Sequence, residues 1–565
     1  MLFRCLPLIA ALLCPASTIA QTDRIYFNGN IITQDESRPH VQAMLVSGGS
    51  IIATGTNAEI RQAAGINTQA IDLRGHTVIP GLIDSHIHAV RAGLTYSSEV
   101  SWIDIPELET GLRHIADAAR ADKDAWLVVA GGWNIQQFAT QRRPELSDIE
   151  GAAPGRAVYI QLAYNAALVS PEGLRRLAIE REDQLPEGAK FERNKQGGPT
   201  GWIIGSGPAI IALFDLLPKQ TLVKNIEGTK RFFKQLNRYG ITGVIDPGGH
   251  NLRPSEYAAL FEMAERGDLS LRVAFSAFAP RPGHEREDFE RLIEDYSSRK
   301  HPLLQFNGIG EAITWGFYNN NDPTPAQQSE FESVALWAAS KDLRLTVHWN
   351  NDASVTHLLN VLERVNASHE LKPLRWSIAH LHDASRATIE RMHNLGLGWL
   401  VQNAGYFAAP SYLRTRGDAV HESPPIASAL RIGMPVGGGT DAHRVMSFNP
   451  FLSLRWMIDG VTVGGLSTRR SNELLSREEA LHVYTSGSAW FTGDESRRGK
   501  IKAGYDADFA VLDRDYFAVP LKEFGNMGAL LTSVAGTIVH AAGPFSDTAT
   551  TSAQTGVSTE ASRAR

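Results

Sequence analysis

Cysteine is nearly absent from this sequence. The 565 residues contain only Cys5 and Cys14, and both fall in an N-terminal stretch that we predict to be removed from the mature protein. A chain without them forms no disulfide and offers neither a thiolate metal ligand nor a cysteine nucleophile. Any metal ion must then be held by histidine, aspartate, glutamate or a modified lysine.

The N-terminal stretch has the three parts of a signal peptide. Arg4 supplies a short positive region, residues 6–13 are apolar, and residues 16–20 are small or polar. We predict that residues 1–20 are the signal peptide, cleaved before Gln21, and that the mature protein is periplasmic or secreted. The apolar run is too short to span a membrane. No stable membrane anchor is therefore expected after cleavage; an uncleaved anchor is the alternative.

The sequence also lacks an excess of positive charge. It has 55 Lys and Arg against 61 Asp and Glu, a net charge of -6. Without a basic stripe, nucleic acid is not an expected partner, and a small-molecule substrate is. With 43% hydrophobic residues, the chain can form a large core and more than one domain. Its oligomeric state cannot be predicted from the sequence.

Short β-branched runs separated by glycine and asparagine occur at both ends of the chain, in residues 24–77 and again after residue 499. They predict one small β-sandwich domain built from residues 21–80 and 492–541. After Gly543 the chain is rich in serine, threonine and alanine and has no apolar period. Residues 542–565 are therefore expected to be a disordered tail.

The middle of the chain, residues 81–491, alternates apolar strand-like runs with amphipathic helical stretches. Such repetition predicts an α/β fold, a (β/α)8 TIM-like barrel with insertions. The polar, glycine-rich residues 184–201 are expected to form an inserted loop or hairpin. The candidate strands are AWLVVAGG, AVYIQL, GITGVID, LRVAFSAF, PLLQFNGIG, LRLTVHW, LRWSIAH and MPVGGGTD.

Several of the predicted barrel strands end in metal-binding residue types. GLIDSHIH ends in His86 and His88, and three later strands end in His348, His380 and Asp441. Residues i and i+2 of a strand share a face, and functional groups of such barrels gather at the C-terminal strand ends. Four imidazoles and one carboxylate converging there suit a divalent ion such as Zn²⁺.

Each of these residues has a simpler explanation when taken alone. An isolated HxH sequence is a weak signal, and a single His348 or His380 is more often a structural histidine. The ordered set of HxH, His, His and Asp at successive strand ends of a β/α repeat is far more specific. We therefore interpret the set as a metal site.

The chain resembles the metal-dependent amidohydrolase superfamily, and within it amidohydrolase family 3, the branch of N-substituted formamide deformylase-like proteins. The resemblance spans nearly all of the predicted mature chain. It implies the barrel, the composite β domain, a metal site and hydrolysis of non-peptide carbon–nitrogen bonds, such as amides and N-formyl or N-acyl groups. The motifs that carry it include TVIPGLIDSHIH, AGGWN, GPTGW, GITGVIDPGG, TVHWNNDA, RWSIAH, GGTDAH and GKIKAGYDADFAVLDRD.

The resemblance also implies roles for individual residues. His86 and His88 look like ligands of the more buried metal. His348 and His380 resemble the pair that binds a second metal, or that contacts the substrate when one metal is present. Asp441 resembles a metal ligand and general base, with His380 as the second catalytic residue, steadying the oxyanion. One or two divalent ions, with zinc the expected metal, would activate the attacking water.

One position departs from the family pattern. A lysine after the middle strand is often carboxylated to bridge two metals, but Lys300 precedes the corresponding strand here. Glu311 stands where that strand should open into the mouth, and its carboxylate offers the same bridging oxygens. We therefore predict Glu311 to be a metal ligand. The alternative is that Glu311 lies outside the ligand set and the site holds one metal.

Three other functions compete with amide hydrolysis. Heterocycle deamination occurs in the same superfamily, but comparable deaminases carry a glutamate shortly after the middle histidine, where this chain has Trp349, Asn350, Asn351 and Asp352. Lactone or phosphoester hydrolysis remains open, since activated water also attacks those centres. An inactive metal-binding barrel is the third alternative, although the complete ligand set argues against loss of activity.

Aromatic and polar residues near these motifs are candidates to line a substrate pocket. The alternative for each is a place in the core. The candidates are Trp133, Tyr164, Asn165, Trp315, Trp349 and Tyr406.

Overall fold

A computed structural model describes residues 23–249 and 252–548 of the chain. The predicted signal peptide, residues 1–20, lies outside the described residues, as do residues 549–565 of the predicted tail. The first part of that tail differs from expectation, because Gly543–Phe545 form a 3-10 helix. Phe545 is buried against the β domain, an apolar contact that the Ser/Thr-rich composition concealed.

Eight parallel strands form the central barrel, in agreement with the predicted fold class. The sheet closes on itself at its two end strands, where Ser85 N–H donates to the Gly438 carbonyl at 2.9 Å. In spatial order the strands are β8 (Leu82–Asp84), β14 (Ile241–Asp246), β15 (Arg272–Ala277), β16 (Leu304–Glu311), β17 (Leu345–Trp349), β18 (Ser377–His380), β19 (Gly398–Gln402) and β20 (Val436–Gly439).

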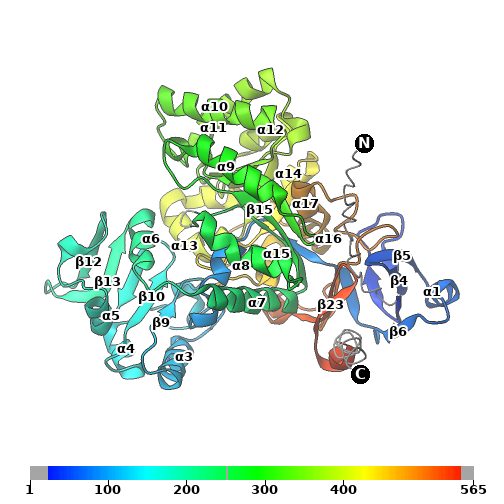
Figure 1. Cartoon of the computed structure of the whole chain (residues 1–565), viewed down its shortest axis with the longest axis horizontal. Helices are drawn as coiled ribbons and strands as arrows, with labels where there is room; N and C mark the ends of the chain where they lie inside the picture. Colours follow the sequence, from blue (N-terminus) through cyan, green and yellow to red (C-terminus); the bar gives the residue numbers. More distant parts are fainter. Residues whose placement is uncertain (1–22, 250–251, 549–565) are drawn as a thin grey trace, which may run out of the picture.

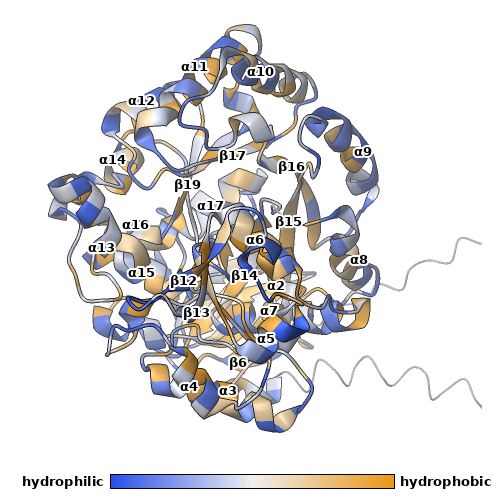
Figure 2. Cartoon of the chain, turned by 90° about the vertical axis from the view of Figure 1, so that its left-hand side faces the viewer, coloured by the Kyte–Doolittle hydropathy of each residue, from blue (hydrophilic) through white to orange (hydrophobic). Residues whose placement is uncertain are grey.

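Helices surround these strands (Figures 1 and 2). The barrel strands are buried on both faces and read as nearly continuous apolar runs, as expected for a parallel sheet. The helices begin at recognisable caps: the Thr221 side chain accepts from Lys224 N–H, and Thr324 forms a capping box with Gln327. The principal helices are α7 (Leu222–Arg238), α8 (Ala258–Glu265), α9 (Glu285–Ser298), α10 (Pro325–Ser340), α11 (Asp352–Ser368), α12 (Arg386–Asn394), α13 (Ala404–Arg416), α14 (Ile426–Arg431), α15 (Pro450–Asp459), α16 (Arg477–Val483) and α17 (Ser486–Ala489).

The two ends of the chain share a β-sheet beside the barrel, at the right of Figure 1. In this six-stranded sheet, β7 (Thr77–Pro80) pairs antiparallel with β21 (Phe509–Leu512). A four-stranded sheet with α1 (Asn57–Ala63) packs against it through an apolar core that includes Tyr26, Met44 and Val511. The other strands are β1 (Arg24–Phe27), β2 (Asn30–Ile32), β3 (His40–Val41), β4 (Ala43–Ser47), β5 (Ser50–Gly55), β6 (Gln69–Asp72), β22 (Ala529–Val534) and β23 (Thr537–Ala541).

A separate five-stranded sheet is inserted between β8 and β14, at the left of Figure 1. It has its own apolar core, which includes Trp102, Trp133 and Trp202. The predicted hairpin in residues 184–201 appears as β12 and β13. The insertion comprises α3 (Leu108–Ala121), β9 (Leu127–Val129), α4 (Leu146–Ala152), β10 (Val158–Leu162), β11 (Ala166–Val169), α5 (Pro171–Arg176), β12 (Ala189–Arg193), β13 (Pro199–Gly205) and α6 (Gly207–Asp215).

The insertion corrects two of the predicted barrel strands. AWLVVAGG and AVYIQL form β9 and β10 of the inserted sheet, and the barrel uses β19 instead. A short apolar run looks the same whichever sheet it joins, so periodicity alone could not separate the two. Among the described residues, no helix combines the length and apolar character needed to cross a membrane.

Candidate metal centre

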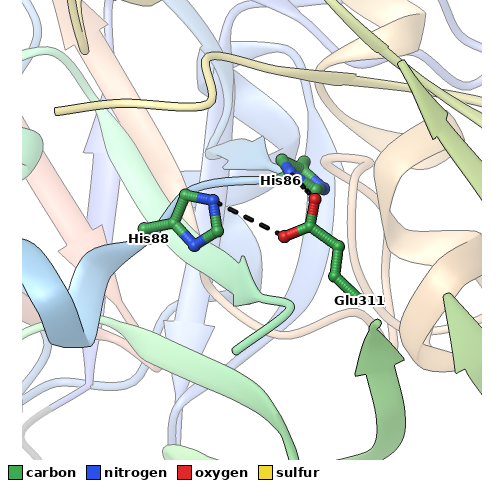
Figure 3. Close-up of side chains that lie close together, drawn as sticks. All are labelled: His86, His88 and Glu311. Carbon is green, nitrogen blue, oxygen red and sulfur yellow. Dashed lines mark ion pairs between the residues drawn. The ribbon is translucent and has the colours of Figure 1, made fainter. Parts of the chain in front are cut away.

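The C-terminal ends of five barrel strands bring all six predicted ligands together. His86 and His88 follow β8, Asp441 follows β20, and the other three stand in strands: Glu311 ends β16, His348 lies in β17 and His380 ends β18. His86, His88 and Glu311 point toward one another (Figure 3). Because parallel strands end at the same edge of a barrel, residues more than 350 positions apart in the chain meet here.

His86 and His88 face two carboxylates. Asp441 Oδ1 lies 3.1 Å from His88 Nε2 and 3.7 Å from His86 Nε2. Glu311 Oε1 lies 3.8 Å from His86 Nε2, and Glu311 Oε2 lies 3.7 Å from His88 Nε2. The distances between carboxylate and imidazole atoms leave room for an ion with ligand bonds of about 2.0–2.2 Å.

Glu311 also contacts the other two histidines. Its Oε1 lies 2.5 Å from His348 Nδ1 and 3.1 Å from His380 Nε2. In the described part of the chain, two groups of three residues have donor atoms close enough to share an ion: His86, His88 and Glu311, and Glu311, His348 and His380. Glu311 is the member common to both groups.

The donor set fits a bound divalent ion. His86 is fully buried, and neither of its ring nitrogens has a hydrogen-bond partner among the described residues. A buried imidazole without partners is costly, and a metal would satisfy its free nitrogen. His88 Nδ1 lies 2.6 Å from the Gly248 carbonyl. If Nδ1 donates that hydrogen bond, Nε2 faces the carboxylates as a free ligand atom, the usual arrangement of a metal-binding histidine.

A buried acid holds the first and last strands in register beneath the site. Asp84 Oδ1 accepts from His86 N–H at 3.2 Å and from Thr440 N–H at 3.1 Å. Its Oδ2 accepts from the Thr440 hydroxyl at 2.6 Å. Asp441 N–H in turn donates to the His86 carbonyl at 2.8 Å. The backbone that carries two of the histidines is thereby tied to the backbone that carries Asp441.

The pKa shifts of His86, Glu311 and Asp441 favour the forms that bind a cation, whereas the hydrogen bond with Glu311 raises the pKa of His380 against the effect of burial. Burial lowers the pKa of His86 to about 3, so its imidazole is neutral. Burial alone would raise the pKa of Glu311, but the His348 charge and the hydrogen bonds of His348 and His380 outweigh it and hold this pKa well below the usual range. For Asp441, burial is likewise outweighed, first by the hydrogen bond with His88, and the pKa is lowered. Neutral imidazole and ionised carboxylate are the ligand forms.

The other candidate residues differ in their exposure and contacts. Lys300 is exposed before β16, at the opposite end of the strand from Glu311. Trp133 donates to the Gln161 carbonyl inside the insertion, and Trp349 donates to Ser354 in the barrel core. Both side chains are buried, as the core alternative expects. Asn165 is exposed, Tyr406 is buried, and Trp315 and Tyr164 are half-buried.

Sequence reasoning missed several polar residues at the mouth. Gln402 ends β19 and Asn403 follows it, and their buried amide atoms have no hydrogen-bond partner among the described residues. Tyr318 stacks on His348 with ring centroids 4.6 Å apart. Arg91 and Arg444 are also buried near the mouth. Arg91 lies three positions after His88, and Arg444 lies three positions after Asp441. This spacing is the one feature of the sequence that connects them with the predicted ligands.

Comparisons with known proteins agree with this geometry. The chain is 24% identical over 553 residues to N-substituted formamide deformylase of Arthrobacter pascens, covering 91% of this chain and 98% of that protein. It superposes on an uncharacterized metal-dependent hydrolase from Pyrococcus horikoshii OT3 with a TM-score of 0.64 at 19% identity, covering 89% of this chain and 99% of that one. A zinc-bound adenosine deaminase from Xanthomonas campestris gives 0.54 at 14% identity, covering 94% and 97%. The two structural likenesses show the shared fold.

A parallel eight-stranded barrel with histidines and carboxylates at its mouth defines a metal-dependent hydrolase, and the protein is an enzyme of this class. The sequence model of the amidohydrolase family matches residues 69–540. The chain belongs to the amidohydrolase family.

Proposed function

We propose that the mouth holds two divalent metal ions, with zinc the expected metal, and that Glu311 bridges them. The observation that supports this most is the position of Glu311 between the two histidine pairs. Its Oε1 contacts His348 and His380, while Oε2 faces His88. On this assignment His86 and His88 bind the more buried ion, and His348 and His380 bind the other. Asp441 completes the set.

We further propose that the enzyme hydrolyses non-peptide carbon–nitrogen bonds of amides, in particular N-formyl and N-acyl groups. The bound ions would activate water and polarise the scissile carbonyl. Asp441 would take the proton from that water and deliver it to the leaving nitrogen. Exposure supports this role: the Asp441 side chain is 13% exposed, against 0% for His86 and 3% for Glu311. If the site holds a single ion, His380 would instead be free to steady the oxyanion.

Deamination of a heterocycle is the second candidate, raised by the fold shared with the adenosine deaminase. The loop after His348 argues against it. Asn350 Nδ2 lies 3.1 Å from His348 Nε2. The Asp352 carboxylate accepts a hydrogen bond from Ser385 N–H at 2.8 Å. It therefore stabilises the backbone of a neighbouring loop and is not directed at the metal centre. This loop supplies no free carboxylate to protonate a ring nitrogen. The similarity to a formamide deformylase favours the amide reaction.

The test is a substrate panel on metal-loaded protein. N-Benzylformamide and N-acetylbenzylamine represent the proposed reaction, and adenosine, guanine and a γ-lactone represent the alternatives. Formate or acetate release that disappears in Asp441→Asn supports amide hydrolysis. Ammonia release from adenosine or guanine, without amide hydrolysis, would assign the chain to the deaminases instead. Asp418→Asn, an exposed carboxylate on the α13–α14 connection, controls for general effects of the substitution.

A further inference from the structure

Two arginines beside the metal centre are buried without a partner of opposite charge. Arg91 is 2% exposed and Arg444 is 3% exposed. Neither forms an ion pair with any described residue. In that part of the chain, Nε and Nη2 of Arg91 and Nε and Nη1 of Arg444 also have no hydrogen-bond acceptor. Charged side chains are almost never buried in this way unless they are paired.

Both arginines adjoin the residues that form the metal centre. Arg91 Nη1 and His88 Nδ1 both face Gly249, each 3.6 Å from the position that a Cβ on this glycine would take. Arg444 follows Asp441 by three residues. The Arg91 guanidinium lies near the Tyr164 ring, and both groups act electrostatically on Arg444.

These three side chains are connected with the metal centre through Tyr318. The Tyr318 ring stacks on His348, and the charges of Glu311, Asp441 and Arg91 all act on its hydroxyl. The Tyr164 ring lies 5.8 Å from the Arg91 guanidinium, and its buried hydroxyl has no hydrogen-bond partner among the described residues. A substrate held at the metal centre would thus have unsatisfied donors beside it.

In the part of the chain that the structure describes, the nearby acids form no ion pair with the two guanidinium groups, although the Glu99 charge acts on Arg444 and the Arg91 charge acts on Asp246. The Glu99 carboxylate lies 2.9 Å from His443 Nε2 and also binds the Thr95 hydroxyl. Asp246 accepts from Val90 N–H at 2.8 Å and from Gly248 N–H at 2.9 Å. The Arg444 guanidinium lies 3.8 Å over the Phe214 ring, and this cation–π contact offsets only part of the cost of burying its charge. Among the described residues, the protein thus places two buried positive charges here without an ion-pair partner.

We propose that Arg91 and Arg444 bind a carboxylate of the substrate, with the Tyr164 hydroxyl as a further donor. The substrate class is then an amide that also bears a carboxylate, such as an N-formyl or N-acyl amino acid. Guanidinium groups suit this role because their N–H groups match the two carboxylate oxygens. The rings of Phe214 and Tyr318 would flank an apolar or aromatic side chain. This inference rests on the proposed amide hydrolysis.

Binding is tested without turnover by titration calorimetry on the metal-loaded enzyme. The probes are 3-phenylpropanoate and 3-phenylpropan-1-ol, which share the phenylpropyl body and differ in charge. The wild type is expected to bind the acid about 10- to 100-fold more tightly than the alcohol. Arg91→Met and Arg444→Met should each remove most of this preference, and Arg91→Lys should restore part of it. Arg120→Met, at an exposed arginine paired with Asp117, is the matched control.

Hydrolysis of N-formylphenylalanine and N-formylphenylalaninamide supplies the second readout. The acid should have a kcat/KM about 10- to 100-fold higher, and Arg91→Met should reduce this ratio toward one. Equal binding of acid and alcohol by the wild type overturns the proposal, whatever the variants do. An acid preference that survives in both methionine variants also overturns it, because the metal alone would then bind the carboxylate. If neither formyl compound is hydrolysed, that failure concerns the proposed reaction, and calorimetry still decides whether the arginines bind carboxylates.

Discussion

The Thr440 hydroxyl donates a 2.6 Å hydrogen bond to Asp84 Oδ2 and so joins the last barrel strand to the first. Asp84 also accepts from the His86 backbone, and Asp441 follows Thr440 directly. The pair therefore sets the distance between the HxH ligands and Asp441. Both residues are completely buried.

We expect Thr440→Val to weaken metal binding while the fold persists. Valine keeps the shape and removes the donor to Asp84. Loss of a group that orients a ligand typically reduces metal affinity by about 10- to 100-fold. Competition with a chromophoric chelator measures the change. Thr532→Val is the control, because the Thr532 hydroxyl donates to the Asn237 carbonyl far from the mouth. Unchanged affinity in Thr440→Val would show that Asp84 does not position the ligands.

His86→Ala and His88→Ala are each expected to remove bound metal together with activity. Both histidines lie on the β8 segment and face the same two carboxylates. No neighbouring side chain replaces either without moving the ion. Metal analysis of the purified variants gives the answer, with the exposed His114→Ala as the control. Full metal occupancy in both variants would place the metal elsewhere.

Asp441→Asn should lower kcat by about 10²–10⁴-fold, the usual contribution of a general base. Asparagine keeps the size of the side chain but cannot take the proton from water. Metal content must be measured in parallel, because Asp441 is also a proposed ligand. A variant with near-wild-type kcat on its best substrate would refute the role of Asp441 as base.

The exported protein is expected to begin near Gln21 and to contain no thiol. Both cysteines precede the predicted cleavage site. Intact-mass measurement and thiol titration of protein recovered from the periplasm or medium test this directly. A retained leader with two titratable thiols in that fraction would contradict the prediction.

The sequence predicted that the candidate ligands would lie close together, because of how barrels are built. Parallel strands end at one edge, so polar residues that end apolar runs are bound to meet there. His86, His348 and Asp441 could be recognised for this reason. The prediction of the barrel strands failed for a short apolar run that does not end in a histidine or a carboxylate. β19 ends in the neutral residue Gln402, and the sequence instead suggested β9 and β10, which belong to the insertion.

Arg91 and Arg444 could not be found from sequence for a different reason. Most arginines are exposed, and only the packed structure shows that these two are buried and without a carboxylate partner. Glu311 could be predicted only in part from the sequence. Its position at the end of an apolar run could be read from the sequence, but its contact with both histidine pairs depends on how the closed barrel brings the ends of β16, β17 and β18 together with the segment that follows β8.

The metal content of wild type and Glu311→Gln, each prepared with and without bicarbonate, tests the central claim most directly. Glutamine keeps the shape of Glu311 but removes an anionic oxygen, so a bridging role predicts two ions per wild-type chain and loss of one in the variant. Bicarbonate should change neither number, because the bridge needs no carboxylated lysine. One ion in both proteins, or activation that depends on bicarbonate, would contradict the account.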